Sequence, residues 1–311
     1  MTPASTGGAV TLRLCQRLER AVSPEQKVEP TMPVANINDL NIHYQVRGLG
    51  EPLLLIMGYR GSGYMWGDEL LAPLSRYFQV ITFDNRGTGD SDKPNSVYTL
   101  PMMAGDAAGL LRHLGISRAH VFGVSMGGMI AQELALHYPK QVNRLILGCT
   151  SCGGPHAILP PMQVLEKLLV PPNMPREEAI RRQWPVMFNP DFLKHHPDML
   201  DLLTARSMEH PTPLYSAMRQ AMAVQRFNTY GRLGQIVAPT LVVAGSTDLI
   251  IPHANSLLLA DRIPRATLEI LPSAGHGFFW EQPGEVVELL SEFCYGSGWR
   301  DDFPEPLPAL C

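Results

Sequence analysis

The sequence predicts an α/β fold with a mostly parallel central sheet, helices on both faces of the sheet, and one helical insertion. Short apolar runs alternate with helix-like segments along most of the 311 residues, which is typical of strand–helix–strand units. The runs are apolar at nearly every position, as in strands that are buried on both faces. The alternation stops over residues 152–232, where prolines recur and no strand pattern is found.

The first half of the chain contains a hairpin pattern and three buried-strand patterns. Side chains alternate in polarity around an Asn-Asp turn, and the apolar run PLLLIM ends at Gly58. A later amphipathic segment is stopped by Pro139. We therefore expect a hairpin over 34–46, strands over 52–57, 78–84 and 119–125, and helices over 102–114 and 127–139.

The alternation resumes after the insertion, which itself holds short helical stretches such as QVLEKLL and EEAIRRQW. We expect further strands over 142–149, 239–248 and 266–276, and helices near 253–262 and 285–293. The predicted organisation is an N-terminal extension over 1–31 that we expect to be disordered, a core over 32–151 and 233–296, the helical insertion over 152–232, and a Pro-rich tail over 297–311.

Composition and charge exclude several classes of protein. Hydrophobic residues make up 45% and charged residues 17% of the chain, which excludes a largely disordered protein. The net charge is -4 and no basic stripe is found, which disfavours a nucleic-acid partner. No apolar run approaches the roughly 18 residues of a membrane span. The N-terminus also lacks the apolar core of a secretory signal, so we expect a cytoplasmic protein.

The five cysteines favour neither a disulfide framework nor a metal site, because their number is odd and the chain is long. Cys149 and Cys152 form a C-x-x-C pattern, but no second pair and no C-x-x-H follows it, so zinc is poorly supported. His195 and His196 also lack companions at metal-ligand spacing. We predict ordinary thiols and no metal, with a redox role for the C-x-x-C pair as the alternative.

Residues 123–127, Gly-Val-Ser-Met-Gly, match the G-x-S-x-G pattern. The pattern alone is weak, but a buried strand runs into it and an amphipathic helix runs out of it, which is the context of a nucleophile elbow. The glycines let strand and helix approach each other, and the turn lifts the Ser125 hydroxyl out at the carboxyl end of the sheet. The alternative is that Ser125 only caps the helix.

A serine hydroxyl needs a base to take its proton, and the base needs a partner that fixes its tautomer. Asp248 ends the strand pattern PTLVVAGSTD, and His276 follows the next strand pattern, which gives the chain order Ser, Asp, His. The carboxyl ends of neighbouring parallel strands lie at one edge of a sheet, so these side chains can meet there. The alternatives are that Asp248 caps the next helix and that His276 is an ordinary loop histidine.

The tetrahedral intermediate of such a reaction needs an oxyanion hole. One donor should be the backbone N–H of Met126, just after Ser125, and the other the N–H of Tyr59, beyond Gly58. Asp84 ends an earlier strand pattern and is expected to make a local turn, so it is a weaker candidate than Asp248. Arg86 and Asp90 of the same loop are expected to brace it.

Together these segments resemble the α/β-hydrolase superfamily over about residues 34–295. The matching segments are LLLIMGYRGSGYMW, FDNRGTGDSDKP, VFGVSMGGMIAQELALHYP, PTLVVAGSTDLIIP and AGHGFFWEQP. The resemblance is to esterase, enol-lactonase and perhydrolase-like members, and it implies that residues 152–232 form a cap over the pocket. The implied catalytic triad is Ser125, Asp248 and His276, and the implied oxyanion donors are Tyr59 and Met126.

Two residues depart from the family pattern in the loop after residues 52–57. Many relatives carry His-Gly where this chain has Met57-Gly58. Because the oxyanion donor is a backbone N–H, the hole should survive the change. Arg60 stands where relatives often carry proline, and its guanidinium would either attract an acidic substrate group or lie in solvent.

The predicted function is a cofactor-free serine hydrolase that cleaves a carboxylic ester or lactone of a small-molecule acyl substrate. The alternatives are hydrolysis of a carbon–carbon bond in a ring-cleavage product, by the same triad, and a non-catalytic receptor for a small ligand. The expected pocket residues are Arg60, Trp184, Met187, Phe188, Met218, Met222 and Phe278. The sequence specifies neither the substrate nor the oligomeric state.

Overall fold

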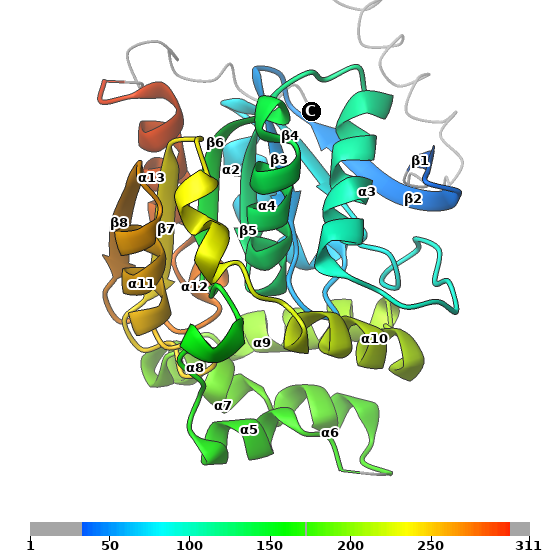
Figure 1. The fold of residues 1–311 in the computed structure, drawn as a ribbon. Coiled ribbons are helices and arrows are strands. Elements are labelled where there is room, and N and C mark those ends of the chain that lie inside the picture. The colour runs from blue at the N-terminus through cyan, green and yellow to red at the C-terminus, as the bar shows by residue number, and fades with distance from the viewer. Residues whose placement is uncertain (1–32, 172, 299–311) are drawn as a thin grey trace, which may run out of the picture. The chain divides into compact units, whose positions relative to one another are not determined.

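An eight-stranded sheet forms the centre of the computed structural model, which describes residues 33–171 and 173–298 (Figure 1). Its strands are β1 (Val34–Ile37), β2 (Leu40–Arg47), β3 (Glu51–Ile56), β4 (Phe78–Phe83), β5 (Ala119–Val124), β6 (Val142–Gly148), β7 (Thr240–Gly245) and β8 (Ala266–Leu271). Their spatial order is β1-β2-β4-β3-β5-β6-β7-β8. β2 is antiparallel to β1 and β4, and the other neighbours are parallel. The predicted fold class is therefore confirmed.

The predicted strands of the core are all found, with some ends moved. The hairpin turns at Asn38 and Asp39, whose φ angles of 51° and 62° match the two left-handed residues of a tight hairpin turn. The largest differences lie after β7 and β8, because the predicted strands extended to Asp248 and His276. The chain instead leaves the sheet earlier. The N–H of Asp248 donates a hydrogen bond to the carbonyl of Gly245 at 3.2 Å and so forms a turn. The predicted N-terminal extension, 1–31, and residues 299–311 of the predicted tail lie outside the described residues.

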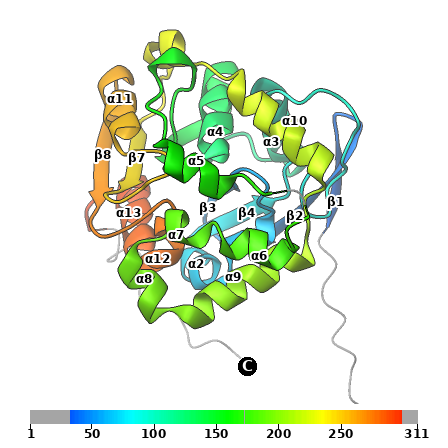
Figure 2. The same ribbon diagram turned by 90° about the horizontal axis from the view of Figure 1, so that it is seen from below.

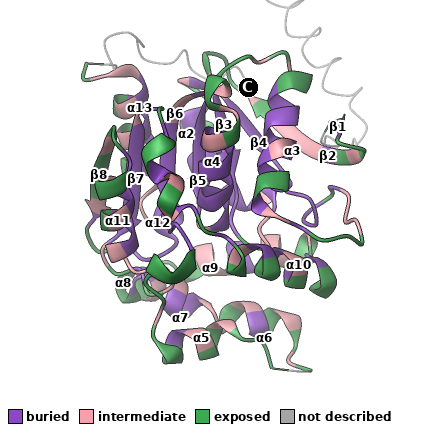
Figure 3. Ribbon diagram, in the orientation of Figure 1, coloured by how far each residue is buried: buried purple, intermediate pink, exposed green. Residues whose placement is uncertain are grey.

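Five helices pack on the two faces of the sheet (Figure 1). They are α2 (Asp68–Leu74), α3 (Leu100–His113), α4 (Met126–His137), α11 (Ala254–Arg262) and α13 (Pro283–Tyr295). Along β3, Leu54 and Ile56 belong to the apolar cluster under α3, α4 and α11, whereas Leu53 and Leu55 belong to the cluster under α2 and α13. Burial on both faces explains the continuous apolar runs (Figure 3). The sequence pattern did not predict α2, because this helix is short and contains Pro73.

The segment between β6 and β7 forms short helices. They are α5 (Met162–Leu168), α6 (Arg176–Arg181), α7 (Trp184–Met187), α8 (Pro190–His195), α9 (Pro197–Glu209) and α10 (Leu214–Gln225). Figures 1 and 2 show them gathered at one end of the sheet. Pro185, Pro190 and Pro197 occupy the first turns of α7, α8 and α9, where a missing N–H costs no helical hydrogen bond. None of the helices among the described residues is long and apolar enough to cross a membrane.

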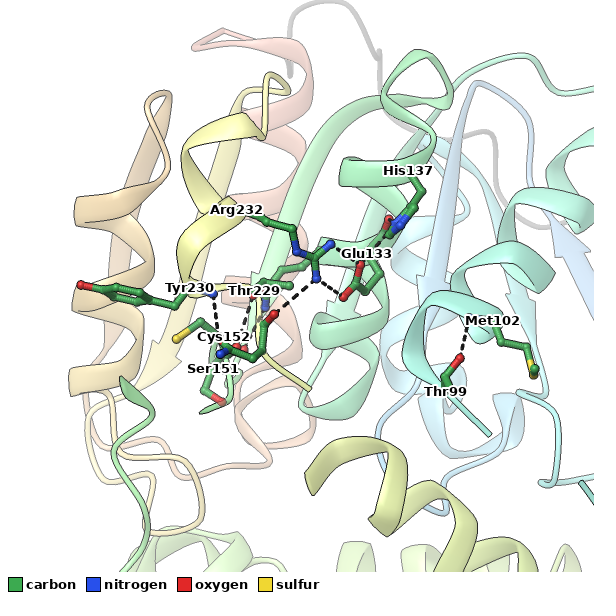
Figure 4. Close-up of polar contacts among 11 residues, drawn as sticks. Thr99, Met102, Glu133, His137, Ser151, Cys152, Thr229, Tyr230 and Arg232 are labelled. Atoms are coloured by element: carbon green, nitrogen blue, oxygen red, sulfur yellow. Dashed lines mark hydrogen bonds and ion pairs between the residues drawn. The ribbon is translucent and has the colours of Figure 1, made fainter. Parts of the chain in front are cut away.

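The two ends of this helical segment are tied to each other and to α4. Thr229 donates its backbone N–H to the carbonyl of Cys152 at 2.9 Å, and its hydroxyl donates to Gln132 Oε1 of α4 at 2.6 Å. Arg232 makes a bidentate ion pair with the buried Glu133 of α4, at 2.6 and 2.9 Å (Figure 4). The chain therefore leaves and rejoins the core beside the helix that follows β5.

Candidate active site

Ser125 lies at a sharp turn between β5 and α4. Its φ of 55° and ψ of -122° lie outside the regions that residues other than glycine normally adopt. A Cβ atom at Gly123 would lie 2.2 Å from Gly127 O, and one at Gly127 would lie 2.0 Å from Ile56 O. The strained turn therefore depends on both glycines of the G-x-S-x-G pattern, and it places Ser125 directly before the first turn of α4.

Asp248 and His276 are hydrogen-bonded to each other in the loops that follow β7 and β8. His276 Nδ1 lies 2.8 Å from Asp248 Oδ2, and both side chains are buried, so the predicted contact is confirmed. Asp248 Oδ1 accepts the backbone N–H groups of Ile250 and Ile251 at 2.8 and 2.9 Å, which fixes the carboxylate. Burial disfavours a charged ring, but the Asp248 carboxylate and the neighbouring Cys149 outweigh it and raise the pKa of His276 above its usual 6.5.

Cys149, the residue after β6, touches both the elbow and the histidine. Its sulfur lies within 4.8 Å of a ring nitrogen of His276, and the carbonyl of the preceding residue, Gly148, accepts the N–H of Ser125 at 2.9 Å. Burial raises the pKa of the thiol, which keeps it protonated at neutral pH. The structure thus brings one buried thiol close to Asp248 and His276, at the end of the strand that pairs with β5. The cysteine pattern predicts an ordinary thiol at Cys149, whereas its place directly after a strand, like that of Ser125, is the signal for a residue of the site.

The loop after β3 runs beside Ser125. A Cβ atom at Gly58 would lie 3.1 Å from Ser125 Cβ and 3.6 Å from its Oγ, so the Gly58–Tyr59 peptide is close to the hydroxyl. Within the described residues, the backbone N–H groups of Tyr59 and Met126 meet no hydrogen-bond acceptor. Two free N–H groups near a serine are what an oxyanion hole requires.

This loop after β3 is held by contacts from both the core and the helical segment. The carbonyl of Met57 accepts the side-chain amide of Asn85 at 3.0 Å. The N–H of Arg60 donates to Gln220 Oε1 of α10 at 3.0 Å, and Gln220 Nε2 donates to the carbonyl of Arg86 at 3.3 Å. Gln220 is not among the residues predicted for the site. Its place on the buried, small-residue face of α10 was the available signal.

A second contact from the helical segment holds the loop that carries the histidine. Glu281, at the end of α12 (Phe278–Glu281), accepts the N–H groups of Gly275 and Asn189, both at 2.5 Å. The N–H of Gly277 donates to the carbonyl of Met187 at 3.0 Å. Burial raises the pKa of Glu281. Glu281 was also missed, because its partner Asn189 belongs to a segment whose fold the sequence pattern did not specify.

The aromatic residues predicted for the pocket lie near this histidine loop. Trp184 and Phe188 pack together with ring centroids 5.4 Å apart, and a Cβ at Gly277 would lie 2.4 Å from the Phe188 ring. Met187, beside them, contacts the loop through its carbonyl. Phe278 is fully buried and packs below the site, where its ring would lie 3.0 Å from a Cβ at Gly148.

The remaining predicted pocket residues are more exposed to solvent. Met218 and Met222 lie on α10 with 57% and 46% of their surface exposed, so the structure does not bury them against the site. Arg60 is half-buried in a left-handed conformation, with φ 61°. In the part of the chain that the structure describes, no carboxylate lies within ion-pair distance of its guanidinium.

Comparison with known proteins places this chain in a family. A family model described as alpha/beta hydrolase fold matches residues 51–283, from β3 through the histidine loop. The chain belongs to the α/β-hydrolase family. This α/β-hydrolase is 29% identical over 263 residues to a putative carbamate hydrolase, RutD, of Azorhizobium caulinodans, covering 85% of this chain and 98% of that protein. It is 30% identical to 3-oxoadipate enol-lactonase 2 of Acinetobacter baylyi, over 79% of this chain and 90% of that protein.

A solved structure of a hydrolase from Pseudomonas aeruginosa is also similar to this α/β-hydrolase. It has 28% sequence identity and a TM-score of 0.75, and the match covers 86% of this chain and 99% of the solved one. The match therefore includes the helical segment as well as the core.

Proposed function

We propose that the protein is a serine hydrolase that cleaves a carboxylic ester or a lactone through an acyl-enzyme. One observation carries the proposal: Ser125 lies in a strained elbow beside two free backbone N–H groups, at the end of the sheet where a buried histidine is 2.8 Å from an aspartate. A hydroxyl in such a setting can attack a carbonyl carbon. The similarity to an enol-lactonase and to putative carbamate hydrolases supports acyl chemistry at this site.

In the proposed reaction, Ser125 attacks the substrate carbonyl while His276 takes the hydroxyl proton. Asp248 keeps the other ring proton on Nδ1 and stabilises the imidazolium. The N–H groups of Tyr59 and Met126 hold the oxyanion of the tetrahedral intermediate. His276 then protonates the leaving alkoxide. Water, activated by the same ring, attacks the acyl-enzyme and releases the acid together with free Ser125.

Carbamates are a second candidate, favoured by the similarity to putative carbamate hydrolases. A carbamate offers the same carbonyl to Ser125 and forms the same kind of tetrahedral intermediate. The leaving group can then be a nitrogen, which His276 would protonate. The residues of the site are therefore the same for both candidates, and substrate turnover separates them.

The site favours a small or medium apolar acyl group. Trp184 and Phe188 bring aromatic surface to the loop of the proposed base, and they form part of the insertion that we propose to be a cap, residues 152–232. Across p-nitrophenyl esters we expect kcat/KM to vary more than about tenfold, with an optimum between about two and eight acyl carbons. A flat profile, or a preference for charged acyl groups, would contradict an apolar pocket. The second result would instead make Arg60 a substrate ligand.

The test of the proposed function is Ser125→Ala, with Ser75→Ala at the end of α2 as the matched control. Both variants are assayed on p-nitrophenyl esters, a lactone panel, aryl carbamates and ring-cleavage dienes, and their folding is checked by circular dichroism. We expect Ser125→Ala to lose about 10⁴- to 10⁶-fold in kcat/KM and the control to match wild type. Retention of more than about a tenth of the activity would overturn the proposal. Diene turnover alone would assign the carbon–carbon reaction, and a bound ligand without turnover would indicate a receptor.

A further inference from the structure

The Cys149 thiol plays no part in the proposed reaction, yet it lies among the side chains that carry it out. One ligand atom from each of Cys149, Asp248 and His276 lies within 4.8 Å of the other two, and all three residues are buried. The three donors are a thiol sulfur, a carboxylate oxygen and a ring nitrogen. This mixed set is typical of ligands for Zn²⁺ and other thiophilic divalent cations.

The geometry of the cluster is close to that of a metal site. Tetrahedral zinc with bonds of about 2.0–2.3 Å places its ligand atoms about 3.3 to 3.7 Å apart, so shifts of about 1 Å suffice here. Two of the ligands are already held by their surroundings. Asp248 Oδ1 accepts two backbone N–H groups, and the N–H of Cys149 donates to the carbonyl of Val243 at 2.8 Å. Hydrogen bonds to a ligating carboxylate, such as those to Asp248, orient metal ligands in known sites, and the bond at Cys149 fixes its main chain.

We propose that Cys149, Asp248 and His276 form a binding site for a thiophilic divalent cation, and that occupation of this site switches the enzyme off. Coordination through His276 Nδ1 would replace the hydrogen bond to Asp248. The ring proton would then be on Nε2, the nitrogen that otherwise accepts the Ser125 proton. Occupation of the site therefore removes the base that the proposed hydrolysis needs. The cation would therefore act as a reversible inhibitor rather than as a cofactor.

Binding at this site releases a proton. The thiol of Cys149 becomes a thiolate, its S–H bond is replaced by a sulfur–metal bond, and the proton passes to solvent. Binding is therefore stronger at higher pH. No electron is transferred, and removal of the cation by a chelator restores the thiol.

Cys152 provides a matched comparison three positions along the chain. Its side chain belongs to the apolar cluster on the opposite face of the sheet from Cys149, and its thiol points to the carbonyl of Gly153 at 3.4 Å. Both cysteines are free thiols. The two sulfurs of the C-x-x-C pattern therefore lie in different environments, and of the two only that of Cys149 lies near Asp248 and His276.

The experiment titrates Co²⁺ into the purified protein without substrate and follows the near-ultraviolet thiolate-to-cobalt absorption. Wild type and Cys152→Ser should each bind one Co²⁺ per chain with this absorption, and Cys149→Ser should lack it. Zn²⁺ should compete with Co²⁺. Zn²⁺ should also inhibit ester hydrolysis by wild type at a concentration at least about tenfold below the one that inhibits Cys149→Ser, because the variant has lost one ligand to the metal.

Equal Co²⁺ spectra for wild type and Cys149→Ser would overturn the proposal, as would equal inhibition of the two by Zn²⁺. Should Cys149→Ser fail to fold, His276→Ala keeps the test decisive, because it removes a second ligand from a loop and must also lose the cobalt absorption. The cobalt spectrum needs no turnover. It therefore succeeds or fails independently of the proposed hydrolase function.

Discussion

Two buried aspartates lie after strand ends of the sheet, and within the described residues only Asp248 is hydrogen-bonded to a histidine. Asp84 follows β4, and its two oxygens accept the backbone N–H groups of Gly63 and Asp90, each at 2.7 Å. One oxygen of Asp248 is satisfied in the same way by the backbone, but the other is hydrogen-bonded to His276. A buried carboxylate at a strand end is therefore structural when the backbone takes both oxygens. It becomes a candidate catalytic acid when one oxygen is left for a ring.

Further close contacts within the loop hold Asp84 in place. A Cβ atom at Gly89 would lie 2.0 Å from Asp84 Oδ2, and the Ser91 hydroxyl donates to the Asp84 carbonyl at 2.8 Å. Arg86 of the same loop forms a buried, bidentate ion pair with Asp106 at 2.5 and 2.6 Å, so the bracing expected of Arg86 is confirmed. These contacts make the β4 loop a rigid support for the site.

Among the carboxylate variants, Asp248→Asn should cause the largest loss of activity. The amide keeps the shape of the carboxylate but cannot hold the proton on His276 Nδ1 or stabilise the imidazolium. We expect kcat/KM for p-nitrophenyl esters to fall by about 10³- to 10⁴-fold with the fold intact. An activity within tenfold of wild type would show that another group orients His276.

Glu281→Gln extends the comparison to a half-buried carboxylate, because both oxygens of Glu281 accept backbone N–H groups. Glutamine keeps only one acceptor, so either Gly275 or Asn189 loses its partner and the histidine loop loosens. We expect a loss of about 10- to 100-fold, seen in kcat more than in KM. An unchanged kcat with a raised KM would mean that Glu281 shapes the substrate pocket instead of positioning the base.

The pH dependence should separate the two aspartates as well. The base must be neutral, and the pKa of His276 is raised above 6.5 by Asp248, so kcat/KM should rise with pH through a midpoint above 6.5. Below the midpoint, activity should fall by about tenfold per pH unit. Asp248→Asn should move the midpoint down, because the carboxylate that raises it is gone. Asp84→Asn should leave the midpoint in place, and a shift in that variant would contradict the assignment.

Asp84→Asn should have the smallest effect on catalysis but a measurable effect on stability. The amide group turns one acceptor into a donor that faces a backbone N–H, at a cost of about 1–3 kcal/mol in the free energy of unfolding. We expect kcat/KM to stay within about tenfold of wild type, because the change does not reach the proposed base.

The sign of the pH effect on stability gives a second readout for Asp84→Asn. Burial raises the pKa of Asp84 above 3.8, so its contribution to stability is fully present below pH 3.8 and is lost as the pH rises through the folded-state pKa. The gap in stability between wild type and Asp84→Asn should therefore narrow as the pH rises. Urea unfolding measured from acidic to neutral pH checks this, and a gap that widens would contradict it.

The sequence predicted the residues of the site that follow the carboxyl ends of strands, although Asp248 and His276 lie in the loops after β7 and β8 and not in the strands. Strand ends follow from apolar runs, so Ser125, Asp248 and His276 could be placed at one edge without knowledge of the loops. Gln220 and Glu281 could not be placed. Their hydrogen bonds join residues 160 and 92 positions apart, through helices whose docking follows no short-range pattern. Contacts of that kind depend on how the whole helical segment packs.

The central claim is that Ser125 is the nucleophile, and covalent labelling tests it most directly. Wild type is treated with a fluorophosphonate, digested and mapped by mass spectrometry, with His276→Ala treated in parallel. We predict a single adduct on Ser125 that forms in step with the loss of ester hydrolysis and forms far more slowly in His276→Ala. An adduct on another serine, or full hydrolytic activity in protein whose Ser125 is labelled, would contradict the claim.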